Sequence, residues 1–131
     1  MKYLCVGYYD NEKMKALTKP EIDAFMSECP PFMEEFHRSG NVLLVAGTDS
    51  ESKGLRRMGG EVTVTDGPVG GGHETVGCVF LLEARDMEEA VRVSRLHPTT
   101  RLAAGEKLGF RIGISPIHSF DERGLKKGVS H

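Results

Sequence analysis

Apolar residues occupy both parities of the first segment of the chain, residues 2–9. Side chains at alternate positions of a strand point to opposite faces, so this pattern predicts a strand that is covered on both faces. One set is Leu4, Val6 and Tyr8, and the other is Tyr3, Cys5 and Tyr9. Shorter apolar runs predict further strands at residues 42–46, 61–65, 76–84 and 110–117.

A helix is predicted between the first two strands. Thr18 and Glu21 have the spacing of a capping box at its start, and Gly40 is typical of its end. Between them the apolar residues recur at helical spacing, namely Ile22, Phe25, Met26, Cys29, Met33 and Phe36. Because proline lacks an amide hydrogen, Pro30 and Pro31 predict a kink or a split in the middle of this helix.

The second half of the chain repeats this alternation of strand and helix. Asp86 and Glu89 have the spacing of another capping box, and the helix they start is predicted to end at His97 and Pro98. The polar residues 47–60 predict a loop or a loose hairpin. The resulting order is the βαββαβ pattern of an α+β, ferredoxin-like fold with one extra hairpin strand. Two helices cover only one face of such a sheet, so we expect a homodimer with an isologous interface on the other face.

Length, charge and residue content exclude several classes of protein. A length of 131 residues predicts one domain, which we place at residues 1–117, followed by a polar tail at 118–131 that we expect to be mobile. The net charge of −2 argues against direct binding to nucleic acid, and the apolar runs are too short for a membrane span or a secretory signal. Neither the three cysteines nor the five histidines have the spacing of a metal site. We therefore expect a cytoplasmic protein without metal or cofactor.

One predicted strand ends in the sequence Asp66, Gly67 and Pro68, which favours a turn. This turn would hold the Asp66 carboxylate at the mouth of the sheet, as a general base or a ligand contact. The alternative is a turn residue that bonds the backbone of its own turn. His73 and Glu74 follow a glycine run and are further candidates for ligand contacts, with Gly67 and Pro68 beside them. A flexible surface hairpin is the alternative for this run.

Cys29 and His97 form a second candidate pair. If they approach each other at one end of the helices, a thiolate beside an imidazole would be a nucleophile pair. In the alternative interpretation Cys29 is an inert core thiol, and His97 is a residue at a helix C-terminus favoured by the helix dipole.

These motifs resemble those of the DGPF group of YCII-related proteins. The resemblance extends to about Ile117. It rests on the opening strand, the apolar run after Gly40, the sequence Thr65-Asp66-Gly67-Pro68, Glu74, and the helix end at His97 and Pro98. It implies a dimeric α+β barrel. The YCII branch carries a histidine and an aspartate in a cleft, but the corresponding positions of this chain fall near Cys29 and near His97.

Two functions are open at this point. The first is a small-molecule enzyme of the lyase or isomerase type, independent of metal and nucleotide, with Asp66 as its acid or base. The second is a non-catalytic ligand-binding or regulatory module, which the link of the DGPF group to sigma factors implies could act with the transcription machinery. For the enzyme we expect a cleft between the first helix and the Asp66 turn, walled by Phe36 and Phe80 and gated by residues 70–74.

Overall fold

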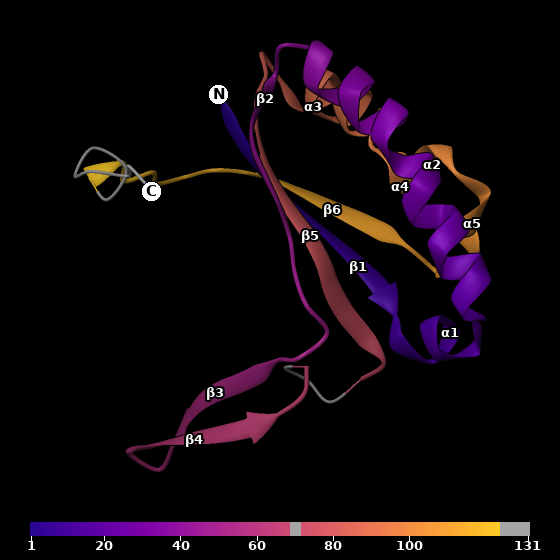
Figure 1. Cartoon of the computed structure of the whole chain (residues 1–131). Helices are drawn as coiled ribbons and strands as arrows, with labels where there is room; N and C mark the ends of the chain where they lie inside the picture. The colour runs from indigo at the N-terminus through magenta and orange to yellow at the C-terminus, as the bar shows by residue number, and fades with distance from the viewer. Residues whose placement is uncertain (69–71, 124–131) are drawn as a thin grey trace.

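The computed structural model describes residues 1–68 and 72–123 (Figure 1). Its centre is a four-stranded antiparallel sheet with the strand order β2-β5-β1-β6. The strands are β1 (Lys2–Asp10), β2 (Val42–Gly47), β5 (Glu74–Glu83) and β6 (Arg111–Pro116). This order places the first strand in the middle of the sheet and confirms the predicted α+β, ferredoxin-like fold.

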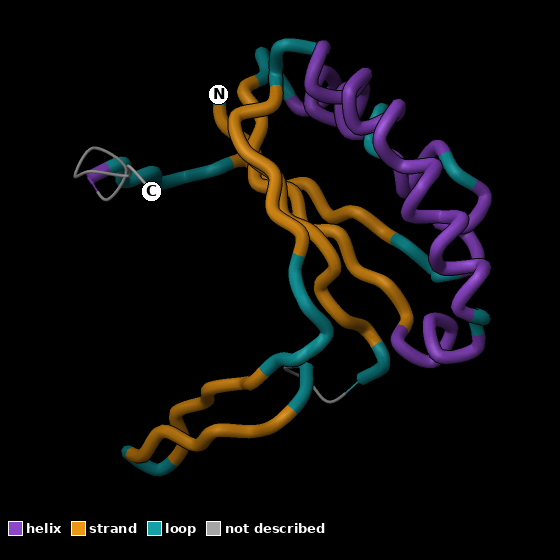
Figure 2. The backbone as a smooth tube through the Cα atoms, viewed as in Figure 1, coloured by secondary structure: helices purple, strands orange, loops and turns teal. Residues whose placement is uncertain are grey.

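The helices lie on one side of the sheet (Figure 2). They are α1 (Asn11–Ala16), α2 (Lys19–Arg38), α3 (Met87–Ser94), α4 (Pro98–Arg101) and α5 (Ala103–Lys107). The sequence predicted α2 and α3 but not the three short helices. Of these, α1 follows β1 directly because the Asp10 carboxylate accepts the amide hydrogens of Glu12 and Lys13. No helix in the described ranges is long and apolar enough to cross a membrane.

Helix α2 starts as predicted, and its two internal prolines do not interrupt it. The Thr18 hydroxyl accepts the amide of Glu21, and the Glu21 carboxylate accepts the amide of Thr18. The helix then continues without interruption through Pro30 and Pro31, so the predicted split is wrong. Both prolines lie on the exposed side of α2, where water can bond the carbonyl groups that lose a helical partner.

The inner face of the sheet packs against the helices and forms the core. Strand residues supply most of it, and α2 adds Phe36 while α3 adds Ala90 and Val93. The buried strand residues are Tyr3, Cys5, Cys78, Phe80 and Leu82. Every second position of β1, beginning at Tyr3, therefore faces the helices.

The outer face of the sheet is also apolar. The register places Leu4 opposite Leu81, and Leu81 opposite Leu44, so the three leucines form one row across β1, β5 and β2. Leu4 is 41% exposed and Leu44 is 42% exposed. Helices α1 to α5 lie on the opposite side (Figures 1 and 2). Part of this row therefore contacts solvent in a single copy of the chain.

Strands β3 (Lys53–Met58) and β4 (Glu61–Asp66) form a separate two-stranded sheet that extends away from the body (Figure 1). The interpretation of residues 47–60 as a hairpin segment is thus confirmed over β3, while the loop interpretation holds for the connection from β2. Gly59 and Gly60 form the turn at its tip, both with positive φ angles of 58° and 83°. Such angles favour glycine.

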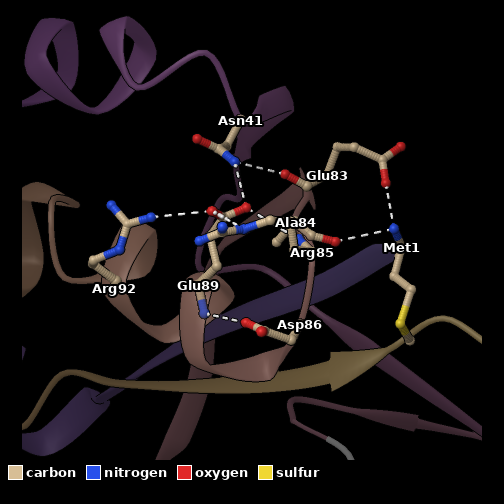
Figure 3. A network of polar contacts seen from close by, with 8 residues as sticks. All are labelled: Met1, Asn41, Glu83, Ala84, Arg85, Asp86, Glu89 and Arg92. Carbon is tan, nitrogen blue, oxygen red and sulfur yellow. Dashed lines mark hydrogen bonds and ion pairs between the residues drawn. The ribbon is translucent and has the colours of Figure 1, made fainter.

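A polar network ties the start of α3 to distant parts of the chain (Figure 3). The Glu89 carboxylate accepts the amide of Arg85 at 3.0 Å, and the Asn41 side chain donates to both Glu89 and the Glu83 carbonyl. The Arg85 amide is the main cause that holds the pKa of Glu89 below its usual range. The Glu83 carboxylate pairs with the Met1 amino group at 2.7 Å. The Asp86 carboxylate accepts the Glu89 amide at 2.9 Å, as the predicted capping box requires, but the Glu89 carboxylate accepts the amide of Arg85 instead of that of Asp86.

Candidate functional site

A cavity of about 350 Å³ lies at the end of the sheet where β5 begins. The connection from β2 to β3 forms one wall, and the turn at Pro68 forms another. Three carboxylates and one ammonium group line it, from Asp49, Glu51, Glu74 and Lys53.

Two backbone contacts shape the walls of this cavity. The Thr48 hydroxyl donates to the Val76 carbonyl at 2.6 Å, which fixes the exit of β2 against β5. The Gly67 amide donates to the Ser52 carbonyl at 2.9 Å, which closes the base of the β3–β4 hairpin. Gly67 has a φ of 86°, so the predicted need for glycine in this turn is confirmed.

Hydroxyl groups add to the polar lining of the cavity. Thr75 lies opposite Tyr9 in the sheet, lines the cavity and is only 4% exposed. Ser52 lines it as well, and its Oγ atom is buried without a hydrogen-bond partner among the described residues. An unpaired buried hydroxyl costs roughly 1–3 kcal/mol. A molecule that hydrogen-bonded Ser52 would recover part of that free energy.

The cavity has more negative than positive charge along its walls. Lys53 pairs with Asp66 at 2.5 Å, and Glu74 pairs with Arg111. Asp49 and Glu51 have no ion-pair partner within residues 1–68 and 72–123. Burial, and then the charge of Asp49, raise the pKa of the neighbouring Tyr9. The cavity therefore favours a cation or a group rich in hydrogen-bond donors.

Several residues proposed from the sequence surround this cavity. Pro68 and Glu74 line it, and Gly67 shapes its wall. Asp66 does not line it: its side chain is 88% exposed and pairs with Lys53, which does line the cavity. His73 is farther out, with Nδ1 3.6 Å from the Glu12 carboxylate. The predicted gate, residues 70–74, includes residues 70 and 71, which lie outside the described part of the chain.

The aromatic residues expected to wall a cleft lie elsewhere. Phe36 and Phe80 are fully buried, with ring centroids 5.0 Å apart and an edge-to-face geometry. His97 completes the cluster and is 3% exposed. This corrects the predicted cleft: the aromatic walls are core residues, and the cavity lies near Pro68 instead.

His97 does contact a thiol, but the thiol is that of Cys78. The distance from His97 Nε2 to Cys78 Sγ is 3.9 Å, while Nδ1 lies 2.8 Å from the Thr99 hydroxyl. Burial lowers the pKa of His97 to about 4 and raises the pKa of Cys78 to about 11. Both groups are neutral at pH 7, so this pair does not supply a thiolate nucleophile.

Cys29 is placed on α2 and is half-buried. Burial, followed by the charge of Glu28, raises the pKa of its thiol. The structure thus places the three proposed catalytic residues in different surroundings: Asp66 is exposed beside Lys53, His97 is buried in the core, and Cys29 lies on α2. Among the described residues, no cluster of three histidine, cysteine or carboxylate side chains is arranged to hold a metal ion.

Comparison with known families identifies the domain. Residues 1–109 match the YCII-related domain. The chain belongs to the YCII-related family. No curated protein matches it. The region that matches the YCII-related domain includes β1 to β5, the cavity and the aromatic cluster, whereas β6 follows it.

The cavity and its surroundings also contain residues that the sequence did not indicate. Asp49, Glu51 and Ser52 fall in a polar segment without periodicity, where no side chain stands out. Thr75 lies one residue before the predicted strand, and Arg111 begins the last strand. Cys78 lies two residues before Phe80 in the same apolar run, so the two side chains are on one face of the strand. This spacing was the sequence feature that could have indicated the contact of Cys78 with His97.

Proposed function

We propose that this YCII-related chain binds a small polar molecule in the cavity beside β5. The observation that carries the proposal is the Ser52 hydroxyl, which is buried in the cavity wall without a partner in the described ranges. Native proteins satisfy nearly all such groups, so an unpaired buried hydroxyl calls for a partner such as a bound molecule, an ion or an ordered water. The nearby Thr75 hydroxyl offers a second hydrogen bond from a buried position.

The charges define the chemical class of the molecule. Asp49 lines the cavity and forms no ion pair with the described residues, so it can bind a protonated amine. The hydroxyl groups of Ser52 and Thr75 then hydrogen-bond a second polar group of the same molecule. A small amino alcohol or a diamine fits this arrangement and a cavity of about 350 Å³.

The Asp66 turn, which resembles that of the DGPF group, supports a catalytic form of the same proposal. In a reaction of the lyase or isomerase type, Asp66 would exchange a proton with the bound molecule. Asp66 is paired with Lys53 and 88% exposed, so the ligand would have to displace Lys53 and exclude water first. The geometry therefore favours binding over catalysis.

Calorimetric titration with 1,4-diaminobutane and ethanolamine tests the binding site, with acetate as a probe of opposite charge. We expect the amines to bind and Asp49→Asn to weaken them about tenfold, a loss of about 1.4 kcal/mol. Glu34→Gln is the matched control because it removes an exposed carboxylate from α2, away from the cavity. Equal binding by acetate, or no effect of Asp49→Asn, would contradict the proposal.

We also propose that the outer sheet face forms a homodimer. The support is the row of Leu4, Leu81 and Leu44, since apolar residues across one sheet face mark a contact surface. Sedimentation of the native protein should show a dimer at micromolar concentration, and Leu4→Lys should yield monomers. Met26→Lys is the control, because Met26 is 62% exposed on α2, on the helical side of the sheet. A monomeric native protein would rule out this interface.

A further inference from the structure

The β3–β4 hairpin, residues 53–66, forms an arm with almost no support from the rest of the chain. Every residue of β4 is exposed, and Gly54 is the one buried residue of β3. Figure 1 shows the arm extending away from the helices and the main sheet. An isolated two-stranded hairpin is marginally stable at best in water. The arm therefore needs a surface to pack against.

One face of the arm carries an apolar strip. The register pairs Leu55 with Val64 and Arg57 with Val62, so these side chains share a face. Leu55 is 70% exposed, Val64 is 60% exposed and Val62 is 59% exposed. The other face carries polar residues such as Thr63 and Thr65. The strip marks the face that contacts a partner.

The charges of the arm are arranged along its length. Arg57 lies near the tip on the face of the apolar strip and forms no ion pair with a described residue, whereas Arg56 and Glu61 lie on the opposite face. Glu51 and Asp49 precede the base, and both lack an ion-pair partner within the same ranges. A surface that is basic at one end, apolar in the middle and acidic at the other end is complementary to an inverted copy of itself.

We propose that the arm packs antiparallel against the arm of a second copy across a two-fold axis. Strands of six residues span about 20 Å, so the tip of one arm lies beside the base of the other. Leu55 and Val64 meet their own counterparts near the axis, and Arg57 of each copy pairs with Glu51 of the other. Glu51 also lines the cavity, but Asp49, the carboxylate proposed to bind the ligand, stays available in this arrangement.

This inference extends the homodimer proposed for the outer sheet face, but it rests on other residues and can fail independently. Arg57→Glu and Glu51→Arg are the decisive variants. Each alone puts like charges at both arm contacts of its own dimer, whereas a mixed dimer restores an opposite-charge pair at each contact.

The experiment mixes the two variants, one of them carrying an affinity tag, and measures co-purification and sedimentation. We expect each variant alone to self-associate about tenfold more weakly than the native chain, and the mixture to form mixed dimers selectively. The preference should shrink at high salt, since exposed charges are screened. Random mixing of the two variants would overturn the proposal, even if the sheet-face dimer persists.

A disulfide cross-link tests whether the apolar strips of two copies face each other. Leu55→Cys in a Cys29→Ser background should form a disulfide with its own counterpart under mild oxidation, because both lie near the axis. Cys5 and Cys78 are buried and do not interfere. Thr65→Cys, on the opposite face of the arm, is the matched control and should remain monomeric on a non-reducing gel. Equal cross-linking of the two variants, or none, would overturn the antiparallel arrangement.

Discussion

The imidazole ring of His97 stacks on the ring of Phe80, with centroids 5.2 Å apart and planes inclined by 9°. Phe36 packs against both rings at near right angles. His97 Nδ1 also accepts the amide of Thr99, at the start of α4. The sequence predicted His97 at the C-terminal end of a helix. In the structure it caps the N-terminus of α4, and its ring packs in the core.

The burial of His97 predicts acid sensitivity. Its folded-state pKa is about 4, below the value of 6.5 for a free histidine. Between these pH values the unfolded chain binds more protons than the folded chain, so stability is present above pH 6.5 and is lost as pH falls toward 4. The loss over this window should be about 3 kcal/mol. Urea unfolding at a series of pH values between 4 and 7 measures it.

His97→Asn is the control for this titration. Asparagine keeps an acceptor for the α4 amide but does not titrate. We expect the variant to be less stable at pH 7, by roughly 1–3 kcal/mol for the lost ring contacts, with a flatter pH dependence than the native chain. An unchanged slope in the variant would assign the acid sensitivity to other groups.

The thiols should differ in reactivity. Cys5 and Cys78 are buried, and burial raises the pKa of both, in Cys78 to about 11. Cys29 is half-buried with a raised pKa, so it should react with a thiol reagent slowly at pH 7 and before the others. Counting labelled cysteines by mass spectrometry checks the order. Early modification of Cys78 would show that the His97 cluster opens in the native state.

Gly105 should be intolerant of any side chain. A Cβ atom at this position would lie 1.9 Å from the Thr99 carbonyl oxygen, so α4 and α5 could not keep their close approach. Gly105→Ala should therefore destabilise the fold by roughly 1–3 kcal/mol or more. Gly113→Ala is the control, since a Cβ atom there meets nothing within 4 Å. Thermal unfolding of the two variants should separate them clearly, and equal melting temperatures would contradict the packing of α4 on α5.

Asp66→Asn separates the two roles considered for Asp66. The Asp66 side chain is 88% exposed and pairs with Lys53, and exposed pairs contribute about 0–1 kcal/mol. We expect melting to change little, because asparagine also suits this turn. Binding of 1,4-diaminobutane measured on the same variant then tests its role at the cavity. A large loss of stability with unchanged binding would make Asp66 a structural residue only.

The sequence determined the features that depend on neighbours along the chain. The box of Thr18 and Glu21, the positive φ of Gly67 and the strand positions all arise from contacts within a few residues. The apolar residues at both parities of β1 predicted a strand covered on both faces, but only the structure shows that Tyr3 and Cys5 belong to the set that faces the helices. Such local preferences need no knowledge of the rest of the fold, so a single sequence is enough to read them.

Only the tertiary structure decided which distant residues meet. Cys78 and not Cys29 lies beside His97 because the register of β5 on β1 turns Cys78 toward the helices. The cavity joins residues 48–53 to residues 74–76, which are brought together by the pairing of β2 with β5. Periodicity records the face on which a side chain lies but not its neighbour from another element. That neighbour is set by packing and register, which are properties of the whole chain.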